Sequence, residues 1–450
     1  DLAQRDDIRG ARFGGEHGNP TESNPWSLYY NPGGIGMSEG YNLGIDASLV
    51  LRDAEYIRPA TGDGTNPETP FNSGTASVSN VIVSPALAFT GHLGDDLPLA
   101  FGFAFFAPFG GSAVWDQVEP SEQYPGAVDG PQRWYTIDGT IRTLSFTGGL
   151  AYEIKPANLS IGLAGNYYIH QLDTIRARND NGTDDLETTD GQGNQILKEG
   201  RSFVEAETTN FGLGVGVLWE PMEDEMWVGL SYQSQPGFGA TDMEGTLKNL
   251  LGTGKETKQD IVFRQELPDI IRLGVRYRPQ ETLELRLFGD YTRWSVFDQQ
   301  CLARKGGDLD EQCTANPDGS ASNPRNSAIQ VFGRSWDDTF GARLGASYWL
   351  LDGGLELIGG LGYDSNAIPD ETLEPALQDY EKFTLSGGAR YAFTDWVALS
   401  LTATNVFYVG RDTSDVATAE TLVGVSRQPS SAGEYSQNIF LLNTGLELSF

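Results

Sequence analysis

The sequence predicts an all-β fold, a 14-stranded antiparallel transmembrane β-barrel with a small N-terminal hatch inside its lumen. Three observations support this fold class: segments of alternating side chains recur along the chain, short and long connections alternate, and the chain ends on an aromatic residue, Phe450. No run of about 18 apolar residues occurs in the 450 residues, which excludes helical membrane spans. Many short alternating segments rich in glycine and aromatic residues are typical of barrels or sandwiches.

The hatch is predicted from the stretch 24–37, which is apolar and aromatic but contains two prolines and three glycines. Those residues forbid a long helix or an uninterrupted central strand. A compact segment of turns packed inside something else fits this composition. We therefore expect residues 1–40 to form the hatch and residues 41–450 to form the barrel.

The strands after the hatch each have one apolar face and one polar face. In one of them Leu283, Leu285, Leu287 and Tyr291 alternate with Glu284, Arg286, Phe288 and Asp290. A soluble sandwich would show the same alternation, so this pattern alone leaves both folds open.

Aromatic residues near the strand ends favour the membrane barrel, because interfacial girdles lie there. The residues expected in these girdles are Tyr152, Trp219, Trp227, Tyr277, Trp294, Tyr391, Phe393 and Trp396. The final strand, 440–450, has Phe440, Leu442, Leu446, Leu448 and Phe450 on one face. Its terminal aromatic resembles the assembly signal of bacterial outer-membrane proteins.

The connections alternate between short turns and long loops, as expected when turns face the periplasm and loops face outward. Six short turns and seven long loops join fourteen strands. The turns are near 94–96, 155–158, 221–224, 279–280, 352–354 and 394–395, and the loops are near 59–77, 110–133, 179–201, 247–258, 298–330, 365–380 and 411–434.

The net charge is −32, from 62 acidic and 30 basic residues, and it argues against a nucleic-acid partner because phosphates would be repelled. The acidic residues concentrate in the expected loops and are read first as a solvated surface. A sharper alternative is that divalent cations bridge these carboxylates to outer-membrane lipids, including lipopolysaccharide. No cofactor and no protein metal site are expected, and the sequence does not determine an oligomeric state.

The two cysteines, Cys301 and Cys313, lie close together in a polar segment. A local disulfide formed in an oxidising compartment is expected, and closing so short a loop stabilises the fold by roughly 3 kcal/mol in the chain-entropy model. No charged and apolar leader precedes Asp1, so we expect a mature chain whose signal peptide has been removed.

Two neighbouring strands contain prolines that an unbroken wall would not accommodate. Pro85 lies in the middle of the second strand, and Pro108 lies near the far end of the third, followed by Gly110. Because proline lacks the ladder donor, the wall is expected to be interrupted or kinked here. One hypothesis is a tolerated bulge, and the other is a lateral opening through which an apolar solute leaves the lumen.

The chain resembles the FadL family of outer-membrane channels for long-chain fatty acids and aromatic hydrocarbons. The segments that carry the resemblance follow the family order over almost the whole chain: 10–16, 30–35, 267–277, 292–297, 335–338, 362–365 and 385–393. The resemblance implies a fourteen-stranded barrel, a hatch of about forty residues and a kinked third strand that provides a lateral exit.

The resemblance also implies site residues. The family's Asn-Pro-Ala hatch motif falls on Asn31, Pro32 and Gly33, and the glycine in place of alanine is expected to loosen the backbone. Family members hold the ligand first in the external loops and then against the N-terminal segment. The ligand-binding candidates are Phe13, Leu28, Tyr29, Arg176 and Arg178, with Arg272 and Arg276 as lumenal alternatives.

Arg272 and Arg276 are more simply explained by ion pairs with carboxylates such as Glu284 and Asp290. A strongly acidic protein does not attract a carboxylate over distance, so neutral hydrocarbons stay open as ligands. Aromatic residues of the external loops (Trp115, Tyr124, Trp134 and Tyr135) are expected to capture the solute.

Passive uptake of hydrophobic small molecules is the leading functional hypothesis, and the chain is not expected to be an enzyme. An outer-membrane lipid hydrolase is the weaker alternative, because His17, His92 and His170 occur without a Gly-x-Ser-x-Gly motif. A structural or assembly-partner barrel that transports nothing is the other alternative.

Overall fold

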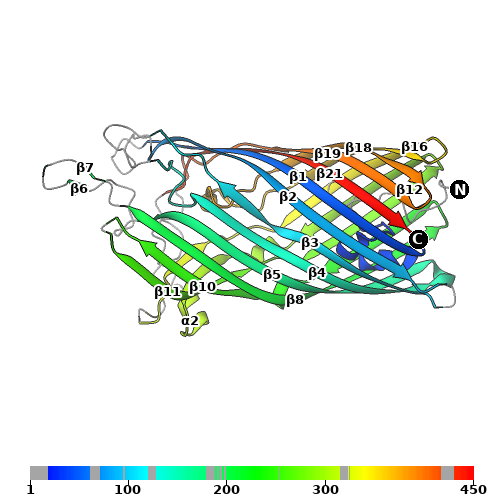
Figure 1. The fold of residues 1–450 in the computed structure, drawn as a ribbon, viewed down its shortest axis with the longest axis horizontal. Coiled ribbons are helices and arrows are strands. Elements are labelled where there is room, and N and C mark those ends of the chain that lie inside the picture. The colour runs from blue at the N-terminus through cyan, green and yellow to red at the C-terminus, as the bar shows by residue number, and fades with distance from the viewer. Residues whose placement is uncertain are drawn as a thin grey trace.

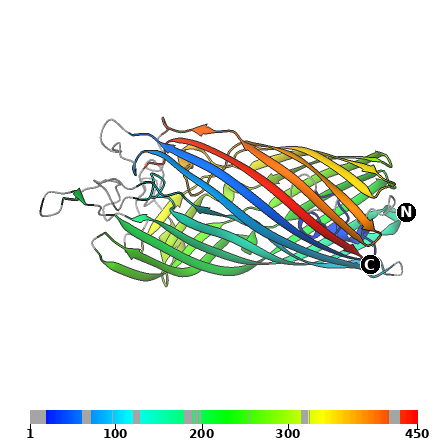
Figure 2. The ribbon, with the colours of Figure 1, turned by 45° about the horizontal axis from the view of Figure 1, so that its top comes forward.

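The computed structural model describes residues 19–60, 71–94, 97–119, 128–178, 188–189, 192, 195–196, 199–252, 254–314, 323, 325–416 and 430–450. Its strands form one antiparallel barrel, closed where β1 (Tyr41–Arg58) pairs with the last strand, β21 (Glu434–Ser449) (Figure 1). Figure 2 shows β21, in red, beside β1, in blue, and β2 lies on the other side of β1. The predicted fold class, an all-β barrel of 14 strands, is confirmed.

The other strands of the barrel wall pair with one another in chain order. The strands between β1 and β21 are β2 (Gly74–His92), β3 (Leu99–Val114), β4 (Asp138–Ile154), β5 (Leu159–Arg178), β8 (Gly200–Met222), β9 (Met226–Gln233), β10 (Ala240–Leu250), β11 (Glu256–Glu266), β12 (Ile270–Gln280), β13 (Leu283–Thr292), β14 (Gln299–Arg304), β15 (Gln330–Gly333), β16 (Thr339–Leu350), β17 (Leu355–Asp364), β18 (Lys382–Thr394) and β19 (Val397–Tyr408). Outside the wall, β6 (Thr188–Thr189) pairs with β7 (Gln195–Ile196), and β20 (Arg411–Asp412) pairs with the start of β21.

Four neighbouring barrel strands are each interrupted once. The pairs β9 and β10, β11 and β12, β13 and β14, and β15 and β16 are successive parts of single strands, because each pair follows the same neighbours. The breaks contain Pro236 in the 3-10 helix η6 (Pro236–Phe238), Pro268, and the 3-10 helix η7 (Trp294–Val296). Proline supplies no ladder donor, which explains the first two breaks.

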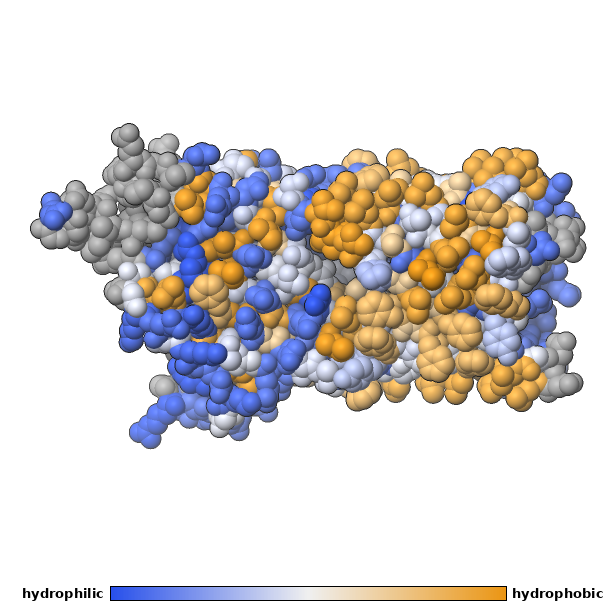
Figure 3. Space-filling model, in the orientation of Figure 1, coloured by the Kyte–Doolittle hydropathy of each residue, from blue (hydrophilic) through white to orange (hydrophobic). Residues whose placement is uncertain are grey.

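The apolar faces of the strands point away from the lumen. The end of the barrel near Phe450 has a belt of apolar residues, whereas polar residues dominate the end with the long loops (Figure 3). Several residues expected in an aromatic girdle are exposed there, including Tyr152, Trp219, Tyr277, Phe393 and Trp396. This is the surface that a transmembrane barrel presents to lipid.

Two residues expected in the girdle lie elsewhere. Trp227 is 3% exposed and faces the lumen, where the guanidinium of Arg276 lies 3.9 Å from its ring centroid. Trp294 lies in η7 and packs against Trp336 and Phe297. A strand end offers a lumenal face as well as a lipid face, so proximity to the end does not decide which way an indole points.

The alternation of short turns and long loops is also observed. The turns at 155–158, 223–225 and 351–354 contain left-handed residues (Asn158, Asp224 and Asp352), which suits tight reversals between antiparallel strands. The 3-10 helix η5 (Lys155–Ala157) forms one of them. None of the helices among the described residues has the length and apolar composition needed to cross a membrane.

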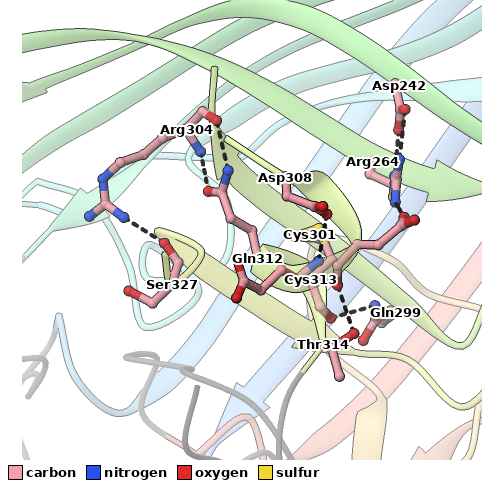
Figure 4. Close-up of a disulfide and its surroundings, with 12 residues drawn as sticks. Asp242, Arg264, Gln299, Cys301, Arg304, Asp308, Gln312, Cys313, Thr314 and Ser327 are labelled. Atoms are coloured by element: carbon pink, nitrogen blue, oxygen red, sulfur yellow. Dashed lines mark hydrogen bonds and ion pairs between the residues drawn. A yellow bond between two sulfur atoms is a disulfide. The ribbon is translucent and has the colours of Figure 1, made fainter. Parts of the chain in front are cut away.

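The expected disulfide joins Cys301 of β14 to Cys313 at the end of helix α2 (Leu309–Cys313) (Figure 4). Asp308 begins the helix, because its carboxylate accepts a hydrogen bond from the Glu311 amide at 3.0 Å. The Gln312 side chain completes the attachment through two hydrogen bonds to the Arg304 backbone. The cystine therefore fastens a short helix to the loop end of the barrel.

Candidate functional site

The described part of the hatch, residues 19–38, fills the lumen near the short turns (Figure 1). It contains helix α1 (Ser27–Tyr30) and the 3-10 helix η4 (Pro32–Met37). Asn31 begins η4: its Oδ1 accepts a hydrogen bond from the Gly33 amide at 3.0 Å. The Asn31 Nδ2 donates to the Pro20 carbonyl at 2.6 Å and to the Val217 carbonyl at 2.9 Å, so this residue ties the hatch to β8.

Gly33 allows a close contact with the wall rather than a looser backbone. A Cβ at this position would lie 2.9 Å from the Gly216 carbonyl oxygen and 3.0 Å from the Leu218 amide nitrogen. Both groups belong to the backbone of β8 and cannot move aside easily. The expectation that glycine loosens the motif is therefore replaced by a packing role, since only glycine fits without a shift.

Glycines of the wall complete this seat for the hatch. A Cβ on Gly162 of β5 would lie 2.2 Å from the Pro32 backbone, and one on Gly229 of β9 would lie 1.9 Å from the Pro20 carbonyl oxygen. A Cβ on Gly216 of β8 would lie 1.9 Å from the Asn31 Oδ1. The hatch lies directly on the backbone of three successive strands, with no side chain of the wall between them at these glycines.

A buried ionic cluster binds the hatch to another part of the wall. Glu22 of the hatch lies 3.4 Å from Arg286 of β13, whose guanidinium is also 2.7 Å from Glu284 and 3.7 Å from Glu356. Glu284 in addition pairs with Arg278 at 3.0 Å and with Arg276 at 3.7 Å. All six side chains are at most 8% exposed. Removing one member would leave buried charge uncompensated, which is costly.

Above the hatch lies a lumenal cavity of 390 Å³. Tyr29 and Tyr30 of the hatch form part of its floor, and Arg272 of β12 lies beside them, with its guanidinium 4.8 Å from the Tyr29 ring centroid. Arg272 is 7% exposed and donates to the Gln233 side chain at 3.2 Å. No ion pair joins it to a carboxylate among the described residues.

The other charged groups around the lumenal cavity compensate one another. Arg343 pairs with Asp290 and with Asp364, each at 2.5 Å, and Lys382 pairs with Asp379 at 2.6 Å. The expected pairing of lumenal arginines is thus correct for Arg276 with Glu284 but wrong for Asp290, which binds Arg343. Arg272 is left as a buried cation held by amide and aromatic groups.

A second segment closes the lumen on the side of the long loops. Residues 365–381, which we call the cap loop, fold inward between β17 and β18 and include the 3-10 helix η8 (Asp370–Thr372). Ile368, Leu373 and Tyr380 of this loop are 0% exposed. They pack against lumenal residues of the first two strands and the last, including Tyr56, Val78 and Tyr435.

Side-chain hydrogen bonds hold the cap loop in place. Arg411 donates to the Asp370 carboxylate and to the carbonyls of Ile368 and Asp379. Arg334 pairs with Glu374 at 2.9 Å, and Ser431 donates to the Leu373 carbonyl at 2.7 Å. The sequence places this segment in an external loop. Its apolar residues Ile368, Leu373 and Tyr380 were the signal that the loop is buried.

An outer cavity of 140 Å³ lies beside the cap loop and is lined largely by apolar side chains, among them Leu172, Leu302 and Phe332. Arg176 lines it, is 8% exposed, hydrogen-bonds the Gln330 side chain and lies 5.1 Å from the Phe332 ring centroid. Arg176 has no ion pair with a carboxylate among the described residues. Arg178, two positions farther at the end of β5, does not line this cavity.

The other predicted ligand residues lie apart from these two cavities or outside the described structure. Leu28 is packed against the wall at Gly102 and Gly149, where it does not line the lumenal cavity. Phe13 lies outside the described residues, as do Tyr124 and His17. Of the loop aromatics expected to capture solute, Trp115, Trp134 and Tyr135 are each at most 4% exposed, and Tyr135 lines the outer cavity.

The wall is open between β2 and β3. Their ladder runs from His92–Ala100 to Leu87–Phe105 and stops there, although both strands continue. Farther on, the Asp116 amide donates to the Ser77 carbonyl at 2.9 Å and the Asn80 side chain bonds the Ser112 carbonyl, which closes the far side. We call this interruption the lateral gap.

Pro85 faces the lateral gap. The His92 amide donates to the Gly40 carbonyl toward β1, so amides at even positions of β2 point to β1 and those at odd positions point to β3. The nitrogen of Pro85 therefore points to the strand that is missing its pairing, and it has no proton to leave unsatisfied. An ordinary residue there would direct an amide into an opening without a partner.

Pro108 and Gly110 shape the other edge of the lateral gap. The register of β3 with β4 shifts between Phe106 and Phe109, so Pro108 lies in a β-bulge. Gly110 has φ 147°, and a Cβ there would lie 2.6 Å from the Ile141 carbonyl oxygen. Pro85, Pro108 and Gly110 thus lie along the two edges of the lateral gap.

His92 and His170, the histidines that the structure describes, show no arrangement of a nucleophile with a base. His170 Nδ1 lies 2.8 Å from the Thr143 hydroxyl and its Nε2 lies 3.0 Å from the Asn210 Oδ1. His92 Nδ1 accepts a hydrogen bond from the Gly94 amide in a turn.

A closed barrel with an apolar outer belt, an internal hatch and a break in its wall defines a membrane channel of the outer-membrane type. The family model described as outer membrane protein transport protein (OMPP1/FadL/TodX) matches residues 10–450. The chain therefore belongs to this family of outer-membrane transport proteins, which confirms the predicted resemblance and the prediction of a channel rather than an enzyme. A search of the curated proteins found no match.

Solved structures support the same fold. A Pseudomonas aeruginosa FadL homologue is 16% identical with a TM-score of 0.76, covering 96% of each chain. The Ralstonia pickettii toluene transporter TbuX is 16% identical with a TM-score of 0.61, covering 95% of this chain and 94% of its own. The P. putida toluene transporter TodX is 14% identical with a TM-score of 0.64 and the same coverage. At these identities the similarity establishes the fold.

Proposed function

We propose that this channel takes up hydrophobic small molecules passively across the outer membrane and releases them sideways into the bilayer through the lateral gap. The observation that carries this proposal is the early end of the β2–β3 ladder, at the level of the hatch and within the apolar belt. Unpaired strand edges at membrane depth are costly unless they face protein or water, so a wall that is open here needs a reason.

The hatch and the cap loop support sideways release over axial passage. We assign the hatch to residues 1–40 and the barrel to residues 41–450. The described part of the hatch, residues 19–38, lies on the backbone of the wall and obstructs the way to the periplasmic end. A solute in the lumenal cavity has Tyr29 and Tyr30 beneath it. The lateral gap offers an exit that leaves the hatch in place and leads into lipid, where an apolar solute is favoured.

Two classes of solute fit the route, long-chain fatty acids and neutral hydrocarbons. TodX and TbuX are described as toluene transporters, which supports a neutral hydrocarbon as the solute. Arg176 at the outer cavity and Arg272 at the lumenal cavity are buried cations without a carboxylate partner among the described residues, which supports the acid. Outer-membrane lipids, including lipopolysaccharide, are the neighbours proposed for the apolar belt.

Arginine substitutions separate these two classes. Arg272→Gln removes a charge-assisted hydrogen bond of about 1.5–3 kcal/mol to a carboxylate, so oleate binding should weaken about tenfold or more while hexadecane binding is unchanged. Binding of both by the purified native chain and the variant, measured by equilibrium dialysis in detergent, decides between them. Equal effects on both ligands would assign Arg272 to the hatch seat alone.

Deletion of Pro108 tests the lateral exit. It removes the extra residue of the bulge, so that β3 can keep one register and continue its ladder with β2. Uptake of labelled oleate and hexadecane by cells expressing the deletion should fall to the level of cells without the channel. Pro108→Ala, which keeps the bulge length, is the matched control. Undiminished uptake by a correctly folded deletion would refute lateral release, and absence of uptake by the native chain would favour a structural barrel.

A further inference from the structure

The bulge in β3 directs two phenylalanine side chains into the lumen. The β3–β4 register passes from Phe106 opposite Ser145 to Phe109 opposite Thr143, so β3 advances three residues while β4 advances two. Ser145 and Thr143 are both buried on the lumenal face. Directly opposed residues share a face, so Phe106 and Phe109 both point inward, although their odd spacing would otherwise separate them.

Phe106 lies where the lateral gap meets the lumen. It is the first residue of β3 beyond the ladder with β2, which ends at Leu87–Phe105. Its side chain is 0% exposed, and its ring centroid lies 5.2 Å from that of Tyr29. Tyr29 lines the lumenal cavity, so Phe106 connects the end of the ladder to the cavity wall through this ring contact.

The wall around this contact is made of small side chains. Ala86 and Ala88 of β2 and Ala104 of β3 belong to the same buried apolar cluster as Phe106. Methyl groups cannot rotate aside or fill a passage, whereas an aromatic ring can do both. The width of any passage here is therefore set by the ring of Phe106 and by the Tyr29 ring that it meets. Phe109, at the other end of the bulge, has its ring centroid 6.4 Å from that of Trp294.

We propose that Phe106, closed against Tyr29, is the gate between the lumenal cavity and the lateral gap and sets the greatest width of apolar solute that leaves. This assignment rests on the proposed function. A linear hydrocarbon needs only a small rotation of the Phe106 ring to pass, whereas a fused-ring hydrocarbon needs the ring to leave its position. Phe106 is then the residue that discriminates solutes by cross-section.

The test compares uptake of n-hexadecane and phenanthrene, both radiolabelled, by cells expressing the full chain. Phe106→Ala should raise the phenanthrene-to-hexadecane uptake ratio about tenfold, the scale of discrimination that a change in one apolar contact supports. Phe106→Trp should lower the ratio. Phe103→Ala is the matched control, because Phe103 is on the same strand, 62% exposed and directed to lipid; its ratio should equal that of the native chain.

Each outcome separates the gate from the uptake function. If the native chain takes up neither hydrocarbon, the proposed function fails. If it takes up both and the ratio stays at the native value in Phe106→Ala, the gate is refuted while uptake stands. Should Phe106→Ala fail to give the heat-modifiable folded band, Phe106→Leu and Tyr29→Leu are measured in its place. Each of them should raise the ratio, and a native ratio in both would overturn the assignment.

Discussion

The hatch and the cap loop both obstruct the lumen, but they are held by different forces. The hatch lies with its backbone against Gly162, Gly216 and Gly229, and the ion pair of its Glu22 with Arg286 is buried. The cap loop has its own apolar core but is fastened by side chains, chiefly Arg411, whose partner Asp370 is half exposed. Backbone contact cannot be released without displacing the strand, whereas a hydrogen-bonded side chain can let go. The comparison indicates that the hatch is fixed in the lumen, whereas the cap loop can be released.

The largest expected effect comes from filling the seat of the hatch. Gly162→Val places a branched side chain where the Pro32 backbone now lies, so the hatch should leave its position. Once the hatch is displaced, the cap loop is the obstruction that stays, and its side-chain fastenings can release. The ion current through planar bilayers should therefore rise roughly tenfold or more while the cap loop is open.

Gly165→Val is the control for this substitution, because Gly165 is on the same strand and has no atom within 4 Å of an added Cβ. Its current should match that of the native chain. A native current in Gly162→Val would mean that the wall yields and that the seat is softer than the contacts suggest.

The next effect concerns the buried cluster that binds Glu22. Arg286→Met leaves Glu22, Glu284 and Glu356 without their shared cation, and breaking such a pair costs about 3–5 kcal/mol. The free energy of unfolding in detergent, measured by urea titration, should fall by this amount. Arg264→Met, which breaks partly exposed pairs with Asp242 and Asp310, should cost about 1 kcal/mol or less. Equal losses of unfolding free energy in the two variants would contradict the expectation that the buried ion pairs stabilise the protein more than the partly exposed ones.

A smaller and more local effect is expected at the cap loop. Arg411→Met removes hydrogen bonds to Asp370, Ile368 and Asp379, a local loss of about 2 kcal/mol. Amide hydrogen exchange within 365–381 should accelerate, while exchange within 19–38 stays at the native rate. Arg293→Met, which breaks an ion pair with Asp269 outside the cap loop, should change neither segment. Faster exchange in both segments would show that the hatch and the cap loop move together.

Alkaline pH should sharpen the same contrast. Burial raises the pKa of the Tyr380 hydroxyl in the cap loop, since the charged form is disfavoured there. A group with a raised folded pKa contributes full stability below its unfolded pKa of about 10 and loses it as pH rises above that value. The protection factors of the cap-loop amides, in which the base-catalysed rise of the intrinsic exchange rate is divided out, should therefore fall above pH 10, and less so in Tyr380→Phe. An identical alkaline response in that variant would locate the sensitivity at other groups.

The barrel followed from local chemistry and was therefore predictable. Strand alternation and turn residues act over a few positions, so six turns, seven loops and the closing strand were all visible in the sequence. Pro85 and Pro108 marked the lateral gap because the loss of a ladder donor is a property of one residue. Gly33 was misread, because its purpose is a contact with β8, nearly two hundred positions away.

Partnerships across the lumen were predicted less well. Asp290 is directly opposite Arg272 in the β12–β13 register, yet it pairs with Arg343 of β16 on its other side. Alternation indicates that a side chain enters the lumen, but not which neighbour it meets. The cap loop was missed for a related reason: Ile368, Leu373 and Tyr380 were assigned to an external loop by position, although burial is what their apolar side chains require.

Pro85 has a consequence for the crowded membrane in which such barrels reside. A bare strand edge is a template on which a neighbouring chain can add a strand of its own, and a breach in a barrel exposes such an edge. Pro85 lies two residues past the end of the ladder and has no N–H, so β2 cannot offer a continuous row of donors to a second molecule. The barrel can thus keep the lateral gap open in the membrane, because a strand of a neighbouring molecule cannot pair continuously with the edge of β2.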